Sequence, residues 1–252
     1  MVQPKKHLGQ HFLHDENIAR KIVNSLSGKC NTIIEVGPGT GILSKYLLAD
    51  SSIQPYFFEI DRESIAYLIK QFPGIETKLI EGDFLEQDLS FLPKPFTVIG
   101  NFPYNISTQI LFRVLEYRNH VPEVVGMFQK EVAERIASPP GSKKYGILSV
   151  LLQAYYSIEY LFTVNESVFF PPPKVKSAVI RLHRNQVTCL DCNEEQFFKV
   201  VKTAFNQRRK TLRNALRPIG IQKDDKISDL LSKRAEQLSV ENFVTLTRSL
   251  AS

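Results

Sequence analysis

The chain has 252 residues, of which 43% are hydrophobic and 23% are charged, a balance typical of a globular protein. No segment approaches the roughly 20 apolar residues of a transmembrane helix, and the polar N-terminus lacks the apolar core of a secretion signal. Lysine and arginine number 32 against 26 acidic residues, which gives a net charge of +6. A basic balance favours a polyanionic partner, although so small an excess identifies none.

The cysteines argue against a disulfide framework, because there are only three of them: Cys30, Cys189 and Cys192. Cys189 and Cys192 form a single CxxC, whereas a metal or redox site would need a second pair or further ligands. We therefore expect reduced thiols, no metal and a cytoplasmic protein.

Apolar runs typical of strands alternate with helical patterns from about residue 30 to residue 184. This alternation predicts a parallel sheet with helices on both faces, closed by two further strands. The expected strands are residues 32–36, 55–60, 77–80, 96–99, 124–128, 160–164 and 177–183. The expected helices are residues 42–48, 62–71, 108–117, 194–216, 224–231 and 240–250. We predict an α/β domain over residues 1–184, with an N-terminal arm over residues 1–20, and a small all-helical domain over residues 185–252.

A glycine-rich loop, with Gly37, Gly39 and Gly41, follows the first expected strand and leads into a helix. Such loops bring the backbone close to a ligand at the carboxyl edge of a parallel sheet. The loop alone fits either a nicotinamide dinucleotide or S-adenosylmethionine. Glu35 favours the second, because negative charge is unfavourable beside a phosphate and favourable beside a sulfonium. We predict that Glu35 and the three glycines bind the cofactor.

Acidic residues also follow the second and third expected strands. Glu59, followed by Ile60, can accept hydrogen bonds from both ribose hydroxyls, and Asp83, followed by Phe84, can accept one from an adenine amino group. Because the carboxyl ends of parallel strands meet at one edge, we predict that all four residues belong to one cofactor site.

The segment Asn101, Phe102, Pro103 and Tyr104 follows the fourth expected strand. An exocyclic adenine amine is a poor nucleophile, because its lone pair is delocalised into the ring. Two acceptors for its N–H groups, the Asn101 side-chain oxygen and the Phe102 carbonyl, would favour the tetrahedral nitrogen that attacks a methyl group. Pro103 fixes the local geometry, and Tyr104 offers a flat face on which the base can stack. The segment therefore predicts methyl transfer to an adenine amine without a strong general base.

Together these motifs resemble the KsgA family of small-subunit ribosomal RNA adenine dimethyltransferases, nearly from end to end. The resemblance is carried by residues 10–13 (QHFL), 35–41 (EVGPGTG), 59–61 (EID), 82–83 (GD), 101–104 (NFPY), 129–131 (QKE), 169–175 (FFPPPKV) with Ser177, and 205–211 (FNQRRKT). It implies a Rossmann-like, seven-strand methyltransferase that converts two adjacent adenosines in a hairpin loop near the 3′ end of 16S rRNA to N6,N6-dimethyladenosine. It also implies S-adenosylmethionine as donor, S-adenosylhomocysteine as product, and the 30S subunit or its late precursor as the partner of a monomer that also serves assembly.

The resemblance assigns roles to single positions. His11 and Leu13 line the donor, Gly37 lies beside its methionine part, and Asn101 lies at the point of methyl transfer. The family commonly has Asn in place of His11 and Leu in place of Phe102. Backbone contacts would survive both departures, whereas a side-chain contact at His11 would not necessarily do so.

Two adjacent aromatic residues, Phe169 and Phe170, precede three prolines that stiffen the loop. Phe169 matches the family's first aromatic residue. We therefore predict that Phe169 stacks on the target base opposite Tyr104, and that Phe170 belongs to the core.

Seven basic residues and no acidic residue lie between Lys199 and Arg217. A solvated helix face usually mixes both signs, so this run predicts contact with RNA phosphates. A second basic loop lies at residues 143–144. The predicted RNA-binding residues are Lys143, Lys144, Arg208, Arg209, Lys210 and Arg213.

Two alternatives remain open. An erythromycin-resistance-type methyltransferase, which acts on large-subunit rRNA, would share the donor motifs, but residues 205–211 argue against it. An RNA-binding assembly or transcription factor without catalysis would not need Glu59, Asp83, Asn101 and Tyr104 together.

Overall fold

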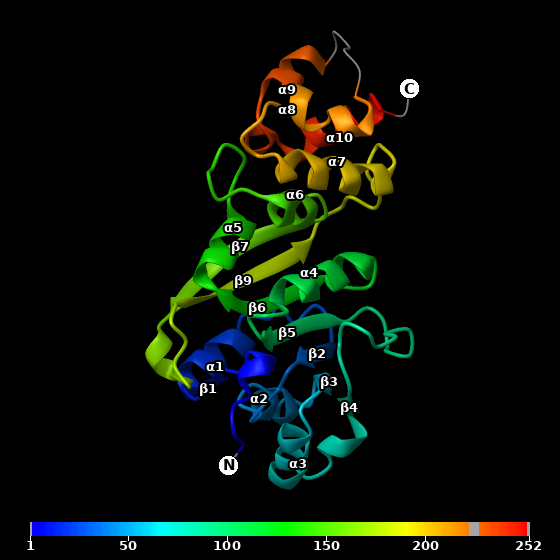
Figure 1. Ribbon diagram of the computed structural model, residues 1–252. Helices are drawn as coiled ribbons and strands as arrows, with labels where there is room; N and C mark the ends of the chain where they lie inside the picture. The colour runs from blue at the N-terminus through cyan, green and yellow to red at the C-terminus, as the bar shows by residue number, and fades with distance from the viewer. Residues whose placement is uncertain (1, 222–226, 251–252) are drawn as a thin grey trace. The chain divides into compact units, whose positions relative to one another are not determined.

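The computed structural model describes residues 2–221 and 227–250, which form two compact units (Figure 1). The first unit comprises Met1–Ala133 and Glu159–Arg184, and the second comprises Glu134–Ile158 and Asn185–Ser252. The division drawn after residue 184 from the sequence stays a prediction, and the structure groups Glu134–Ile158 with the C-terminal residues.

Seven strands of the described residues form one sheet, in the order β4-β3-β2-β5-β6-β9-β7. Their bounds are β2 (Thr32–Val36), β3 (Gln54–Glu59), β4 (Leu79–Glu81), β5 (Thr97–Asn101), β6 (Glu123–Gln129), β7 (Tyr156–Val164) and β9 (Ser177–Arg184). Strands β2 to β6 pair in parallel, and β9 pairs antiparallel with β6. The predicted Rossmann-like, seven-strand fold is thus confirmed.

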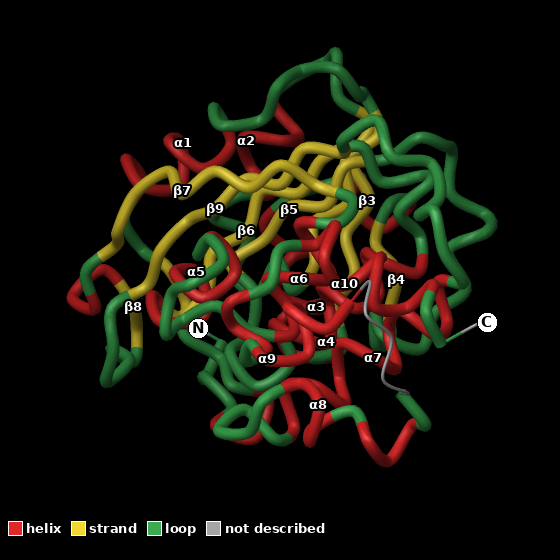
Figure 2. Tube along the Cα trace, turned by 90° about the horizontal axis from the view of Figure 1, so that it is seen from above, coloured by secondary structure: helices red, strands yellow, loops and turns green. Residues whose placement is uncertain are grey.

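Every residue of β2 is buried, as expected for a strand covered on both faces. Helices α1 (Glu16–Val23), α2 (Ser44–Ala49) and α3 (Arg62–Gln71) pack side chains such as Ile22, Leu47 and Leu68 into one cluster with Ile33 and Phe57 of the sheet. Helix α4 (Ser107–Glu116) lies on the other side of the sheet from α1 and α2 (Figure 2). The short helix η2 (Ile75–Thr77) precedes β4.

The strand order reverses at β2, which has β3 on one side and β5 on the other. Sheets of this kind bind ligands beyond the carboxyl ends of the strands at such a switch point. The loops after β2, β3, β4 and β5 are therefore the ones that build a site.

A second, two-stranded sheet joins distant parts of the first unit. Strand β1 (Phe12–Leu13) pairs antiparallel with β8 (Phe169–Phe170), with Leu13 opposite Phe169 and Phe12 opposite Phe170. The turn η1 (Lys6–Leu8) precedes β1, and η3 (Glu166–Val168) precedes β8. This pairing ties the N-terminal arm to the proline loop, a connection that the sequence did not predict.

The second unit is mainly helical among its described residues. Its elements include α6 (Ile147–Gln153), α7 (Glu194–Asn206), α8 (Leu212–Ala215), η4 (Arg217–Ile219), α9 (Ser228–Ser232), η6 (Ala235–Gln237) and α10 (Val240–Arg248), and α5 (Lys130–Ala137) begins in the first unit. Within the described ranges, no helix is both long and apolar enough to cross a membrane.

The single helix predicted over residues 194–216 is wrong, because α7 ends at Asn206 and α8 begins at Leu212. The intervening turn carries three successive bases without an acidic residue to pair with them along a helix. Instead, the Leu212 amide donates to the Lys233 carbonyl at 2.8 Å. Of the helix predicted over residues 224–231, positions 224–226 lie outside the described residues, and α9 begins at Ser228.

Candidate functional site

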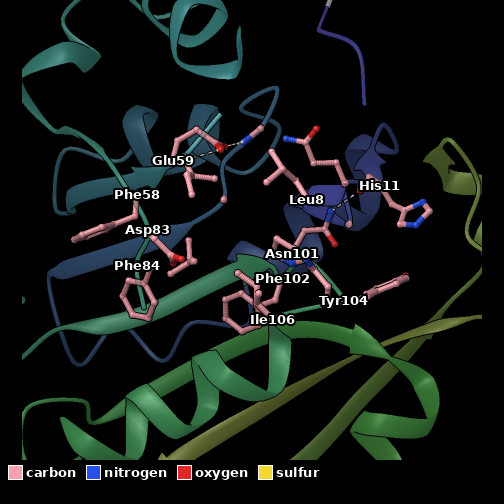
Figure 3. Close-up of a pocket in the computed structure, with 18 of the residues that line it drawn as sticks. Leu8, His11, Phe58, Glu59, Asp83, Phe84, Asn101, Phe102, Tyr104 and Ile106 are labelled. Atoms are coloured by element: carbon pink, nitrogen blue, oxygen red, sulfur yellow. Dashed lines mark hydrogen bonds between the residues drawn. The ribbon is translucent and has the colours of Figure 1, made fainter. Parts of the chain in front are cut away.

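A cavity opens at the carboxyl edge of the sheet, around the switch point (Figure 3). It is lined by residues 8–12 of the arm and by residues 36, 37, 39, 58–60, 82–84 and 101–106. No lysine or arginine is among these lining residues, whereas the two carboxylates Glu59 and Asp83 are. The cavity therefore suits a neutral or cationic ligand better than a phosphate.

Glu59 ends β3 and is held by the backbone. Its Oε2 accepts from the Gly39 amide at 2.9 Å, and its Oε1 accepts from the amides of Ile60 and Asp61, both at 2.9 Å. Gly39 has a φ of +57°, and a side chain there would meet the Phe12 ring at 2.8 Å. Burial raises the pKa of Glu59, and these three amides oppose that shift. Oε2 accepts only one of these three bonds, so it keeps acceptor capacity for a hydroxyl of a ligand.

Asp83 and Phe84 follow β4. Asp83 Oδ1 accepts from the Leu85 amide at 2.9 Å, and no described residue is recorded as bonded to its Oδ2. Phe84 is buried and meets Phe58 edge to face, with ring centroids 5.4 Å apart. Ile60 is 50% exposed at the same cavity. An apolar wall beside a free acceptor suits an aromatic base that carries an amino group.

Asn101, the last residue of β5, is oriented by the N-terminal arm. Its Nδ2 donates to the His11 carbonyl at 2.9 Å, as the dashed line in Figure 3 shows. A carbonyl can only accept, so the amide nitrogen must face His11. The Asn101 Oδ1 is left as an acceptor at the cavity.

Phe102 and Tyr104 complete this part of the cavity. The buried Phe102 ring packs against Phe128 at 5.2 Å and occupies the space beside Gly126, where an added Cβ would lie 2.4 Å from it. The Tyr104 hydroxyl is bonded to Ser177 Oγ at 2.6 Å, which anchors the far end of the ring. Burial raises the pKa of Tyr104, so this phenol is neutral at physiological pH.

The His11 ring lies beside Tyr104, with centroids 5.3 Å apart and planes inclined by 32°. Its Nδ1 is 2.7 Å from the Pro171 carbonyl and must carry a proton to bond there. The His11 side chain thus contacts Tyr104 and the proline loop, and its backbone carbonyl contacts Asn101.

Glu35 and Gly41, both predicted to bind the cofactor, do not line the cavity. The Glu35 carboxylate is buried and accepts from Ser44 Oγ at 2.7 Å, and burial raises its pKa to about 8. This carboxyl is mostly neutral at pH 7, so the predicted attraction to a cation is corrected. Gly41 has a φ of +79° and leaves room for Phe72, whose ring an added Cβ would meet at 2.4 Å.

Leu13 and Phe169 do not line the cavity either. Both are 2% exposed and belong to the core cluster, whereas Phe170 is 55% exposed. The expected arrangement of the two phenylalanines is therefore reversed, because the pairing of β8 with β1 turns Phe169 inward with Leu13.

Several lining residues were not assigned from the sequence: Leu8, Gly9, Gln10, Phe12, Phe58, Asn105 and Ile106. Gln10 and Phe12 stand inside the QHFL motif, which was the available signal. Asn105 follows the NFPY segment, and its Nδ2 donates to the His7 carbonyl at 3.3 Å.

All the predicted RNA-binding residues lie in the second unit. Lys143, Arg209, Lys210 and Arg213 are exposed. Lys144 forms an ion pair with Glu134 at 2.6 Å, and the Arg208 guanidinium donates to the Lys143 carbonyl and lies 3.8 Å from Glu236. Arg208 thus braces the basic loop.

The described residues contain no group of three or more potential metal ligands. What the cavity does contain is a fixed carboxylate, an apolar wall with a free acceptor, an oriented amide oxygen and a tilted aromatic ring. The carboxylate and the apolar wall can bind a nucleoside, and the amide oxygen and the aromatic ring can bind a second aromatic base beside it.

A sequence profile described as Ribosomal RNA adenine dimethylase matches residues 1–252. The chain is 58% identical to the Ribosomal RNA small subunit methyltransferase A of Cytophaga hutchinsonii over 99% of this chain and 98% of that protein. It is 54% identical to the protein of the same name from Flavobacterium johnsoniae, over 99% and 96% of the two chains.

Among solved structures, a dimethyladenosine transferase from Plasmodium falciparum superposes with a TM-score of 0.79, covering 94% of this chain and 96% of that one at 24% identity. The 23S rRNA methyltransferase ErmE superposes with a TM-score of 0.72, covering 96% and 100% at 23% identity. These two likenesses show the fold.

Proposed function

The chain belongs to the ribosomal RNA adenine dimethylase family, and from this premise we propose that it dimethylates N6 of two adjacent adenosines in the 3′-terminal hairpin loop of 16S rRNA. The methyl donor is S-adenosylmethionine and the product is S-adenosylhomocysteine. The substrate particle is the 30S subunit or its late precursor in the cytoplasm, where a monomer of this protein also serves assembly. The small-subunit names of the relatives at 58% and 54% identity support this choice of RNA.

The observation that carries the proposal is the orientation of Asn101, whose Nδ2 is bonded to His11 at 2.9 Å so that Oδ1 is left for the substrate. Asn101 Oδ1 and the Phe102 carbonyl accept the two N–H groups of the target amine. They favour its tetrahedral form and stabilise the positive charge that develops on it. The proton leaves after the transfer, so no strong base is required.

The donor site fits the same reaction. Glu59 Oε2 accepts from a ribose hydroxyl, Asp83 Oδ2 accepts from the adenine amino group, and Ile60 and Phe84 cover the adenine ring. When bound, the donor supplies an electrophilic methyl group on a sulfonium. The absence of lysine and arginine from the lining suits this cation and disfavours a pyrophosphate.

Tyr104 supplies one face for the target base. For the other face we favour Phe170 over Phe169, because Phe170 is exposed and pairs across the small sheet with Phe12, which lines the cavity. Stacking of this kind would compensate for unstacking the adenosine from its loop.

In this proposal the second unit contacts the RNA phosphates. Lys143, Arg209, Lys210 and Arg213 are exposed, so they are the bases that meet phosphate directly. Arg208 and Lys144, which make ion pairs within the unit, hold the shape of this surface.

The test is methyl transfer from a labelled donor to ribosomal subunits that lack the modification. The proposal expects label in 30S particles and none in 50S particles. Label in the 50S subunit would show an erythromycin-resistance-type enzyme instead. No transfer to either particle, by protein that binds the donor, would favour a non-catalytic assembly factor.

A further inference from the structure

Residues 5–13 of the N-terminal arm connect the loop after β3, which carries Asp61, to the end of β5, which carries Asn101. Residues 8–12 line the cavity itself. At one end the arm is bonded to Asp61, two residues after the ribose ligand Glu59. At the other end it is bonded to Asn101.

The first attachment centres on the buried Asp61 carboxylate, whose side chain is 1% exposed. Lys5 Nζ forms an ion pair and hydrogen bond with Asp61 Oδ1, and Gln10 Nε2 donates to Asp61 Oδ2 at 3.3 Å. The Gln10 Oε1 in turn accepts from the Lys5 amide at 2.8 Å, which closes a ring of contacts between the arm and the loop.

The same loop holds the donor site together. The Asp61 amide donates to Glu59 Oε1 at 2.9 Å, and the Asp61 side chain caps α3 through the Glu63 amide and accepts from Ser64 Oγ at 2.9 Å. Asp61 is therefore rigidly fixed relative to Glu59. Removing Lys5 would leave Asp61 with three polar partners in place, so the fold of this loop would survive.

The second attachment sets the acceptor groups. The His11 carbonyl receives Asn101 Nδ2 at 2.9 Å, and the His7 carbonyl receives Asn105 Nδ2 at 3.3 Å. Between these carbonyls, Gly9 passes so close that an added Cβ would lie 2.5 Å from Asn105 Oδ1. If the arm moves, the Asn101 amide loses the partner that keeps its oxygen toward the substrate.

We propose that Lys5, Gln10 and Asp61 form a latch that holds the arm in place. Within this latch, Lys5 and Asp61 are positioning residues for methyl transfer. Neither residue lines the cavity. They act on the reaction through the arm and Asn101, because a reacting group displaced by about 1 Å can lose on the order of 100-fold in rate. This inference rests on the proposed adenine methyl transfer and adds a requirement to it.

The test compares Lys5→Met with a control, Lys6→Met, which removes the same charge one residue along the arm. The Lys6 side chain is exposed and forms no ion pair with the residues that the structure describes. With donor and RNA saturating, Lys5→Met should lower kcat about tenfold, the effect of losing a charged hydrogen bond. Lys6→Met should leave kcat unchanged, and Lys5→Arg should restore most of the loss. Equal kcat values for Lys5→Met and wild type would refute the latch.

A double-mutant cycle tests the route through Asn101. In an Asn101→Ser background the side chain no longer reaches His11, so adding Lys5→Met should cost less than about twofold more. If the two losses multiply instead, the latch does not act through Asn101 and the proposal is wrong.

Hydrogen exchange separates failure of the latch from failure of the proposed function. With S-adenosylhomocysteine bound, the amides of residues 8–13 should exchange faster in Lys5→Met than in wild type, whatever RNA the enzyme uses. Unchanged exchange overturns the latch even if wild type methylates 30S particles. Faster exchange in a protein that methylates no RNA supports the latch and refutes the function.

Discussion

Replacing Asn101 by alanine removes two things at once, the acceptor Oδ1 and the bond from Nδ2 to the His11 carbonyl at 2.9 Å. Loss of one hydrogen-bonding group aimed at charge that develops in the transition state costs about 3–4 kcal/mol, or roughly 100- to 1,000-fold in kcat. Loss of the bond to the arm is worth about 1 kcal/mol, so donor affinity should fall by no more than about fivefold.

Asn105→Ala is the matched control, because Asn105 also lines the cavity and also donates to a carbonyl of the arm, at 3.3 Å. It removes a tether to the arm but no acceptor that is assigned to the target amine, so its kcat should fall by less than about fivefold. The assay is single-turnover transfer to unmethylated 30S particles, with donor affinity measured by calorimetry. If Asn101→Ala transfers methyl groups at the wild-type rate, or if both variants lose kcat equally, the acceptor role of Asn101 is refuted.

Three further predictions concern other parts of the chain. Burial raises the pKa of Glu35 from 4.5 to about 8, so the folded state retains a proton that the unfolded state has lost, and stability should fall as pH rises through that range. Glu35→Gln should flatten this decline in Tm between pH 6 and pH 8.5, and an unaltered slope would contradict the assignment. Gly126→Ala would place a Cβ 2.4 Å from the Phe102 ring, so it should cost about 1–3 kcal/mol of stability and lower kcat, as chemical unfolding and the transfer assay would show. Reversing the charge of Arg209 and Lys210 should weaken 30S binding most at low salt and reduce the dependence of affinity on salt concentration. Lys70→Glu, at an exposed position on α3, should change neither. A salt dependence unchanged from wild type would refute the proposed contacts of Arg209 and Lys210 with phosphate.

The parallel sheet could be predicted because buried strands such as β2 are short, mainly apolar segments that alternate with helical patterns. The strand ends that carry Glu59, Asp83 and Asn101 followed from it, and all three line one cavity. The family predicted from the motifs is confirmed, since its profile matches residues 1–252.

What could not be predicted depends on contacts between distant segments. Phe169 and Phe170 are chemically identical, and only the register between β8 and β1 decides which one is buried. The sequence suggests that Glu35 is charged, but burial raises its pKa to about 8, so the carboxyl is mostly neutral at pH 7. The latch between Lys5 and Asp61 joins positions 56 residues apart, which no local pattern reveals.

The helix predicted over residues 194–216 failed for a related reason. Its apolar spacing continues across the break, but the Leu212 amide bonds to Lys233 and Arg208 reaches Lys143. Tertiary hydrogen bonds therefore override a helical pattern that lacks opposite charges along its surface.

The most direct measurement of the central claim is the identity and position of the nucleosides made by the purified protein. RNA from the treated 30S particles would be digested and analysed by mass spectrometry. The account predicts N6,N6-dimethyladenosine at two adjacent positions in the 3′-terminal hairpin loop of 16S rRNA, and loss of both in Asn101→Ala. A methyl group on any other atom or at any other site would contradict it.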